Sequence, residues 1–189
     1  MTMWQSFRCG LMAMAATVLL SSAAVAAEPE LRASPNGGNS SVGGQIIVTI
    51  GITDISDLFA YQFSLSFDPS KLLLNNVSAG SFLSGAGSTV FDGGVIDNGN
   101  GQLSFLYESL IGAVPGASGS GLLATLQFDV VGAGTSGLFF SDVLFLDSSL
   151  SEISLQVTPG FVTTVPEPAA ALLFALGLAG LLGARRRAV

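Results

Sequence analysis

The residues in this sequence that could do chemistry are carboxylates, above all the close pairs Asp54/Asp57 and Asp142/Asp147. Two carboxyl groups that flank one bond can hydrolyse a glycoside, one as general acid and the other as base or nucleophile. Both pairs fall where predicted strands give way to loops, and acidic residues at such places commonly form turns and keep the surface solvated. We therefore interpret them as structural and predict no catalytic residue.

Other nucleophiles and ligands are scarce. The sequence has no histidine, and its single cysteine, Cys9, lies close to the N-terminus. The rest of the chain therefore cannot build serine–histidine or cysteine–histidine catalysis, or zinc sites from these residues. Ser70 and Lys71 are adjacent, and adjacent side chains at a strand end point apart, which argues against a serine–lysine dyad. These absences predict that the protein is not an enzyme.

Oxygen ligands suited to calcium are common in the predicted loops. The best candidate is the run Asp97-Asn98-Gly99-Asn100-Gly101, which lacks the acidic spacing and closing glutamate of an EF-hand loop. Asparagine and glycine tolerate the positive φ of tight hairpins, so we predict a hairpin turn, with a calcium site as the alternative. No metal or other cofactor is expected to be required.

Strands are the elements that must carry any binding surface. Apolar residues recur with period two, and no amphipathic helix is evident between residues 28 and 165. The clearest strand is 59–67, and Asp68-Pro69 ends it because proline cannot continue a central ladder. Further strands are predicted at 45–52, 72–77, 102–108, 122–130, 138–140, 143–146, 153–157 and 161–165. Eight or nine short strands with glycine turns predict an all-β sandwich with phenylalanines inside, and 82–94 and 112–121 as irregular segments.

Aromatic residues bear on carbohydrate binding, because sugars stack on exposed Trp or Tyr. The only tryptophan, Trp4, lies near the N-terminus. Tyr61 and Tyr107 both fall on the apolar side of an alternation, the second after Leu103 and Phe105. We therefore expect both tyrosines in the core and no flat aromatic platform.

The N-terminal residues 1–27 have the pattern of a secretory signal peptide. Arg8 precedes an apolar run at 11–20, and Ala24-Val25-Ala26 supplies a small-x-small cleavage site. A first transmembrane helix is the alternative. Cys9 precedes the apolar run, so it is not a lipoprotein acylation site and leaves with the signal peptide. Residues 28–42, rich in proline, asparagine and glycine, are predicted to be a linker.

The C-terminal residues 165–189 have three parts: Pro166-Glu167-Pro168, sixteen apolar or glycine residues from Ala169 to Ala184, and Arg185-Arg186-Arg187. A helix over the apolar part would be about 24 Å long, close to the ~30 Å hydrocarbon core of a bilayer. The arginines would hold the end on the cytoplasmic side. We predict a membrane-inserted helix, with a buried core helix as the alternative.

This tail closely resembles the PEP-CTERM sorting signal of Gram-negative, biofilm-forming bacteria. The likeness includes Pro166, Glu167 and Pro168, the apolar span, and Arg185, Arg186 and Arg187. It implies processing by an exosortase, a membrane enzyme thought to cut near the Pro-Glu-Pro. The protein would then be exported through the inner membrane, anchored there transiently through 169–184, and released to the cell surface or beyond.

A second resemblance covers the body, residues 43–164. The strand ending Phe67-Asp68-Pro69 with Leu72 after it is similar to the "aromatic-Asp-Pro-x-x-Leu" ending of a cohesin strand. The run 121–130 is similar to the cohesin strand "Leu-Ala-x-Leu-x-Phe-x-Val". The likeness implies a nine-stranded jelly-roll sandwich, related in fold to carbohydrate-binding modules. Cellulosomal cohesins bind dockerins through one sheet face, whose contact residues this resemblance does not identify.

The net charge of the body limits the classes of partner that it can bind. Residues 28–165 contain two basic and twelve acidic residues, a net charge of −10, which disfavours nucleic acid and anionic lipid. We predict an exported, non-enzymatic cohesin-like module for binding or adhesion at the cell surface or in an exopolysaccharide matrix. The alternative is a carbohydrate-binding or dockerin-binding accessory module in polysaccharide catabolism.

Overall fold

The computed structural model describes residues 28–36 and 40–166. This part of the chain forms eleven β-strands. They are β1 (Glu30–Asn36), β2 (Ser40–Ser41), β3 (Gln45–Ser66), β4 (Leu72–Ala79), β5 (Thr89–Asp92), β6 (Val95–Asp97), β7 (Gln102–Leu110), β8 (Ala117–Val130), β9 (Gly134–Asp147), β10 (Gln156–Thr158) and β11 (Gly160–Val165). The predicted all-β class is confirmed.

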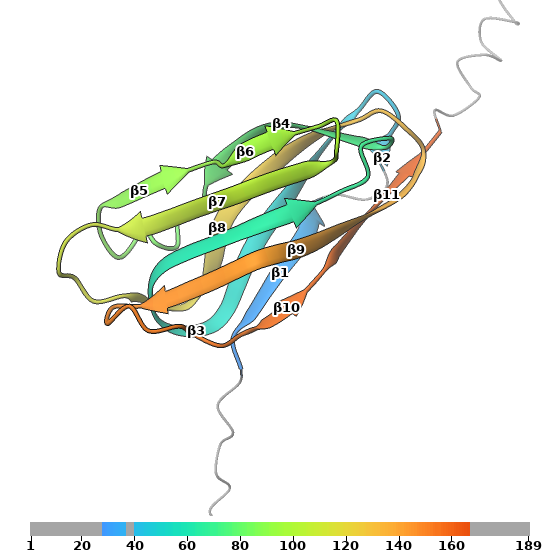
Figure 1. The fold of residues 1–189 in the computed structure, drawn as a ribbon. Helices are drawn as coiled ribbons and strands as arrows, with labels where there is room; N and C mark the ends of the chain where they lie inside the picture. The colour runs from blue at the N-terminus through green and yellow to red at the C-terminus, as the bar shows by residue number, and fades with distance from the viewer. Residues whose placement is uncertain (1–27, 37–39, 167–189) are drawn as a thin grey trace, which may run out of the picture.

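The long strand β3 joins two packed layers (Figure 1). Its first half pairs with β1 and β8, and its second half pairs with β7 and β9. One layer therefore has the order β10–β1–β3–β8–β4, and the other has β5 and β6 followed by β7–β3–β9–β11–β2. Asp54 and Asp57 lie between the two halves with φ of 54° and 57°, and the β3–β8 register shifts around them. Such bulges bend a strand, which lets one strand serve both layers.

The core lies between the layers and follows the alternation in the sequence. Ile46, Val48, Ile50 and Ile52 are all buried, as predicted for 45–52. Tyr61, Phe63, Leu65 and Phe67 are buried as well, and Phe59 is half-buried against them. The Tyr61 ring stacks on those of Phe63 and Phe145. Two apolar faces packed in this way are the main favourable contribution to folding.

The predicted linker at 28–42 is wrong over most of its length, because it contains β1. Leu31 and Ala33 are buried, and β1 pairs with both β3 and β10. Only two apolar positions alternate there, too few to stand out beside the prolines and the Asn-Gly run. The segment 82–94, predicted irregular, likewise contains β5.

The predicted alternation of Leu103, Phe105 and Tyr107 is also wrong after its first member. Phe105 has a φ of 56°, and the β3–β7 register shifts there, with Phe63 opposite Leu106 and Leu65 opposite Leu103. A bulge adds one residue and moves those beyond it to the other face. Leu106, Glu108 and Leu110 consequently point inward, while Tyr107 is 39% exposed. Of the two tyrosines expected in the core, only Tyr61 lies there.

The two ends of the described domain lie at opposite ends of the sandwich (Figure 1). Pro29 is held by the Gln156 amide, and the Val165 carbonyl accepts a hydrogen bond from the Val42 amide. Residues 1–27 and 167–189, with the predicted signal peptide and apolar tail, are outside the described residues. Within the described ranges, no helix has the length and hydropathy needed to cross a bilayer.

Candidate binding face

The outer faces of the two layers differ in chemistry. On the layer that contains β8, Gln45 donates to Asp129 (2.9 Å) and accepts from Gln127 (2.9 Å). Thr49 and Thr125 lie half-buried on the same two paired strands. This face is therefore mainly polar, and Gln45, Gln127 and Asp129 on it bond to one another.

The other layer carries exposed apolar side chains, and Figure 1 looks directly onto it. Because both edges of β7 are paired and its inner side faces the core, the exposed side chains of β7 point outward. Phe105 is 55% exposed, Tyr107 39% and Leu144 on β9 38%. We use the name binding face for the outer surface formed by Ala60, Gln62, Phe105, Tyr107, Asp142, Leu144 and Leu146.

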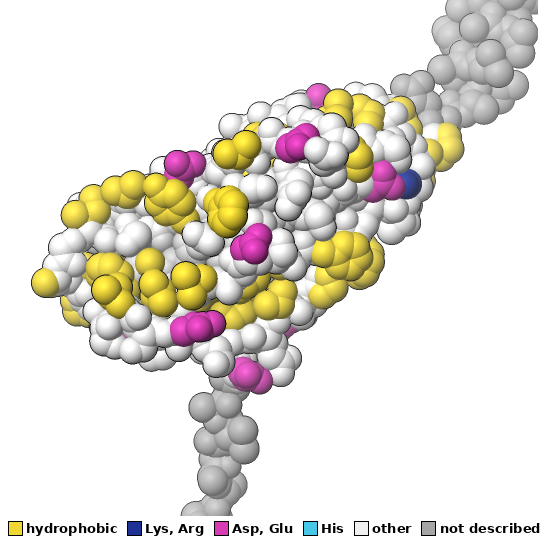
Figure 2. All heavy atoms as spheres, viewed as in Figure 1, with side chains coloured by type: hydrophobic (Ala, Val, Ile, Leu, Met, Phe, Trp, Pro, Cys, Tyr) yellow, Lys and Arg dark blue, Asp and Glu magenta, His cyan; other side chains and the backbone are white. Residues whose placement is uncertain are grey.

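A shallow pocket of about 160 Å³ opens on the binding face. Its walls come from three neighbouring strands, with Tyr107 on β7, Gln62 on β3 and Leu144 on β9. Figure 2 shows apolar side chains gathered over this side of the molecule, with acidic side chains spaced among them. The pocket can accept a small apolar side chain, with the Gln62 amide as a polar group beside it.

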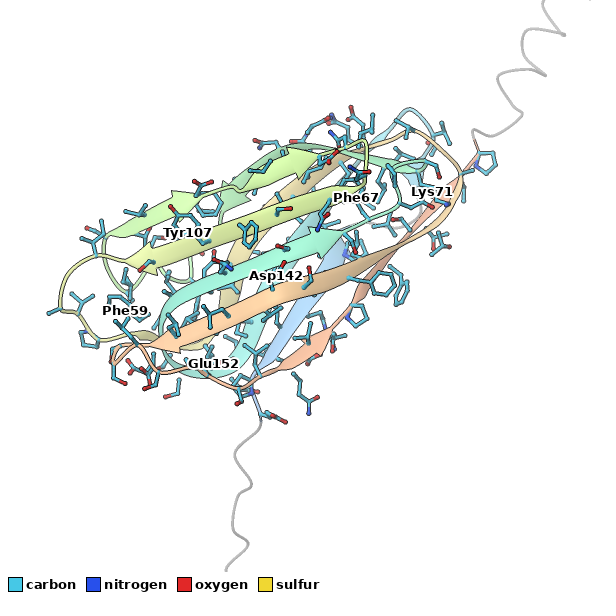
Figure 3. All side chains as sticks on the ribbon, viewed as in Figure 1. Phe59, Phe67, Lys71, Tyr107, Asp142 and Glu152 are labelled. Carbon is cyan, nitrogen blue, oxygen red and sulfur yellow. The ribbon has the colours of Figure 1, made fainter. Side chains whose placement is uncertain are left out.

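Two bulges flank Ser64 at the centre of this layer. On one side, the Phe105 amide donates to Ser64 Oγ (3.1 Å). On the other side, Asp142 has a φ of 50° and the β3–β9 register shifts between Gln62 and Ser64. Figure 3 shows Tyr107 on β7 and Asp142 on β9 turned toward the viewer, with β3 between them. Left-handed backbone costs most non-glycine residues about 1–2 kcal/mol and aspartate less, so the fold holds the Phe105 bulge against the intrinsic preference of that residue.

Beneath the binding face lies a buried polar pair that the sequence reading missed. The Tyr61 hydroxyl is 2.9 Å from Glu108 Oε2 and 2.7 Å from the Leu123 carbonyl oxygen. Burial, and then the nearby Glu108 charge, raise the pKa of the Tyr61 hydroxyl. Glu108 is 1% exposed, and its Oε1 has no partner within the described ranges. Strict alternation from Leu103 would point Glu108 outward, and the bulge at Phe105 turns it inward.

Three of the four predicted carboxylates lie inside strands rather than at strand ends, whereas Asp147 is the last residue of its strand, as predicted. Asp54 and Asp57 are within β3, and Asp142 and Asp147 are within β9. The structure instead brings Asp57 near Asp147, which pairs with the neighbouring Leu58, and the negative charge of Asp147 partly opposes the lowering of the Asp57 pKa. Ser148 Oγ donates to Asp57 Oδ2 (2.6 Å), and this bond is the main reason that the pKa of Asp57 is lowered.

The carboxylates of Asp57 and Asp147 both accept hydrogen bonds that hold neighbouring loops in place. The Gly116 amide donates to Asp57 Oδ1 (2.8 Å), while Ser149 and Ser151 donate to Asp147 Oδ1 (2.6–2.9 Å). Those hydrogen bonds lower the pKa of Asp147. Acceptors already occupied by loop donors are poorly placed for acid–base work.

The run 97–101 forms the predicted hairpin turn between β6 and β7. Asp97 Oδ1 accepts from the Gly99 and Asn100 amides, and Oδ2 accepts from Asn100 Nδ2 (2.7 Å). Asn98 bonds both the amide and the carbonyl of Leu74. Among the described residues, no group of three or more Cys, His, Asp or Glu side chains is arranged to hold a metal ion.

The cohesin-like motif residues shape the turn after β3. Phe67 and Leu72 are buried, while Asp68 Oδ1 accepts from the Ser70 amide and hydroxyl, and Oδ2 from Lys71. The Lys71 and Ser70 bonds lower the pKa of Asp68 to about 2. Ser70 and Lys71 thus both bind Asp68 and form no dyad. Of the sorting-motif residues, only the exposed Pro166 is described, and Glu167, Pro168 and Arg185 to Arg187 lie outside the described residues.

Comparison with known proteins gives two family matches. Residues 33–163 match the model of the cohesin domain, and residues 164–187 match the model of the PEP-CTERM protein-sorting motif. A search of curated proteins finds no match.

Solved structures with a similar fold include several cohesins. One is a non-cellulosomal cohesin from the hyperthermophilic archaeon Archaeoglobus fulgidus, at 20% identity and TM-score 0.61, covering 77% of this chain and 96% of that one. Another is a type II cohesin domain from the cellulosome of Acetivibrio cellulolyticus, at 19% identity and TM-score 0.59, covering 72% and 95%. A third is a type II cohesin–X-dockerin complex from the same organism, at 17% identity and TM-score 0.62, covering 73% and 100%. At these identities the likeness shows the fold.

Proposed function

Because the chain belongs to the cohesin domain family, we propose that it is an exported, non-enzymatic module that holds a macromolecular partner on its binding face. The observation that supports this most directly is the contrast between its two outer surfaces. Phe105, Tyr107 and Leu144 are exposed on one face, whereas the opposite face presents Gln45, Gln127 and Asp129 bonded to one another, with Ile47 exposed beside them. Contiguous exposed apolar side chains commonly mark interaction sites.

A dockerin-like protein is the partner class we favour. One similar solved structure is a cohesin in complex with a dockerin, and proteins of this fold are binding modules. The absence of histidine from the sequence, and the loop-tying hydrogen bonds of Asp57 and Asp147, support a non-catalytic role.

The proposed route of export uses both ends of the chain. Residues 1–27 act as a signal peptide, and the PEP-CTERM match at 164–187 supports sorting by an exosortase that recognises Pro166-Glu167-Pro168 and Arg185-Arg186-Arg187. The apolar span 169–184 holds the precursor in the inner membrane until it is processed. The binding domain then runs from β1 to β11, and it is displayed at the cell surface or in the extracellular matrix.

Retention at the cell surface tests this function. We would express the full chain carrying Tyr107→Ser and Leu144→Ser and measure how much processed protein stays with cells and matrix rather than the medium. Ile47→Ser is the matched control, because Ile47 is exposed on the opposite face. The binding-face variant is expected to move into the medium while the control stays. Equal retention of both would contradict the proposal.

Carbohydrate is the second candidate partner, and the exposed ring of Tyr107 is the observation that favours it. A sugar can stack on such a ring beside the Gln62 amide. This alternative predicts that the purified chain is retained on insoluble polysaccharide. The Tyr107→Ser variant should lose this retention, and the Ile47→Ser variant should keep it. Passage of the chain straight through such a column would exclude it.

A further inference from the structure

We propose that the binding face recognises a segment of a partner protein in which a basic side chain lies beside an apolar one, with Phe105 and Asp142 as its paired anchors. This inference rests on the proposed function and names the chemistry of the partner. It combines the backbone of the two bulges, the spacing between them and the charge around them.

The backbone at Phe105 is the least expected among the residues of positive φ. Five non-glycine residues of the described chain have positive φ: Asp54, Asp57, Phe105, Asp142 and Leu150. Aspartate tolerates this conformation because its short polar side chain can bond locally, whereas a bulky aromatic residue rarely adopts it. The ring of Phe105 nevertheless stays 55% exposed. The bulge turns Leu106 and Leu110 into the core and leaves the Phe105 ring outside, where the strained backbone fixes its direction.

The two bulges lie at the same level on either side of one strand. The bulge at Phe105, on β7, lies opposite Ser64 of β3. The bulge at Asp142, on β9, lies opposite the step from Gln62 to Ser64 on the other edge of β3. Two strand spacings separate them, roughly 10 Å. That is about the diameter of an α-helix with its side chains. One helical or extended segment lying along β3 can therefore touch both anchors at once.

Charge selects the partner's side chain. The carboxylate of Asp142 is exposed, and the one hydrogen bond to it among the described residues is a long one from Ser141 Oγ (3.4 Å). The two basic residues in the described ranges lie elsewhere and are paired: Arg32 on β1 bonds Glu30, and Lys71 bonds Asp68. The binding face thus offers a negative charge with no cation of its own to neutralise it.

An arginine or lysine on the partner complements this arrangement. A guanidinium can donate hydrogen bonds to the Asp142 carboxylate, and its flat face can lie against the ring of Phe105 or Tyr107. An adjacent apolar side chain would enter the pocket between Tyr107 and Leu144. The net charge of −10 over residues 28–165 also attracts basic partners and repels acidic ones.

The test uses the full chain in detergent micelles and a library of random peptides displayed on phage. Enriched peptides are expected to contain Lys or Arg next to a large apolar residue. The strongest peptide is then synthesised, and its Kd is measured for each variant at two salt concentrations. Asp142→Asn and Phe105→Asn are each expected to weaken binding by about tenfold or more. Raised salt should weaken binding of the unmodified chain as well.

Matched controls exist for both anchors. Asp54→Asn and Leu150→Asn change an exposed residue of positive φ in the same way, but outside the binding face. They are expected to alter Kd by less than about twofold. Asparagine tolerates left-handed backbone, so all four variants should fold, and their melting curves check this.

Several results would overturn the inference. Peptides without basic residues, the absence of any enriched peptide, or an unchanged Kd for Asp142→Asn would each contradict it. A further outcome is that the double variant Tyr107→Ser with Leu144→Ser abolishes binding while Asp142→Asn and Phe105→Asn do not. That result would support the proposed binding face and contradict the role of Phe105 and Asp142 as anchors. If none of these variants changes the Kd of an enriched peptide, both the anchors and the proposed binding face are contradicted.

Discussion

The Tyr61 hydroxyl lies within hydrogen-bond distance of two oxygens, Glu108 Oε2 at 2.9 Å and the Leu123 carbonyl at 2.7 Å. A tyrosine has one hydroxyl proton, so it cannot donate fully to both. The contact joins β3, β7 and β8 through the core, directly behind the binding face. A buried oxygen without a good partner costs about 1–3 kcal/mol.

Substituting Glu108 tests how this pair is bonded. In Glu108→Gln, the amide can donate to Tyr61 Oη while Tyr61 donates to Leu123, so the melting temperature should stay the same or rise. Glu108→Ala removes the partner and leaves a cavity, and it should cost about 2–4 kcal/mol. Thermal unfolding followed by circular dichroism measures both variants. Equal losses in the two would show that the carboxylate itself is required.

Acid should destabilise the domain in a defined pH range. Hydrogen bonds from Lys71 and Ser70 lower the pKa of Asp68 to about 2, and hydrogen bonds also lower the pKa of Asp57, Asp97 and Asp147. A lowered pKa in the folded state means that the charged form stabilises the fold. That stability is complete above the unfolded value of about 4 and is lost as pH falls toward 2.

Urea unfolding at a series of pH values checks this expectation. The unfolding midpoint should fall steadily below about pH 4, and Asp68→Asn should flatten the slope. Asp92→Asn is the control, since the Asp92 carboxylate accepts a single hydrogen bond within its own turn, from the Gly94 amide. A midpoint that does not change on acidification would contradict the prediction.

Gly101 should tolerate no side chain. Its φ is 67°, it is buried, and an added Cβ would collide with the Phe67 carbonyl oxygen, whose residue also donates its amide to Gly101. Gly101→Ala is therefore expected to cost more than about 2 kcal/mol of unfolding free energy.

Gly112 provides the comparison. It has a φ of 89°, but a Cβ there meets nothing within 4 Å. Gly112→Ala should thus cost only about 1–2 kcal/mol for the backbone conformation. Chemical denaturation measures both variants, and a larger loss at Gly112 than at Gly101 would count against the described turn.

Calcium should not be needed for stability. Both oxygens of Asp97 accept hydrogen bonds from donors in their own turn. Addition of a chelator is therefore expected to leave the melting temperature unchanged, as is addition of calcium to a chelated sample. A fall of several degrees with chelator would instead identify a bound cation.

The ends of the mature protein should lie outside the folded domain. Pro29 and Val165 are held by backbone hydrogen bonds to Gln156 and Val42, so processing should stop before either is removed. Mass spectrometry of the protein from its native host is expected to show a start near Glu28 and loss of Arg185, Arg186 and Arg187. A purified protein that retains the arginines and both apolar ends would contradict the proposed sorting.

Alternation predicted the strands that face the core along their whole length, such as 45–52 and 59–67. It failed where a residue's face depends on the neighbouring strand. Phe105 and Asp142 form bulges because β7 and β9 must match the register of β3, and no local signal marks that step. The same bulges placed Tyr107 outward and Glu108 inward. The binding face could therefore not be read from the sequence, although the family of the domain could.

Site-specific photo-cross-linking in the native matrix tests the central claim most directly. A benzoylphenylalanine at position 107 lies on the binding face, and one at position 125 lies on the opposite face. The proposed function predicts one cross-linked macromolecular partner from position 107, reduced by Leu144→Ser, and none from position 125. Cross-links from position 125 alone, or equal yields from both positions, would contradict it.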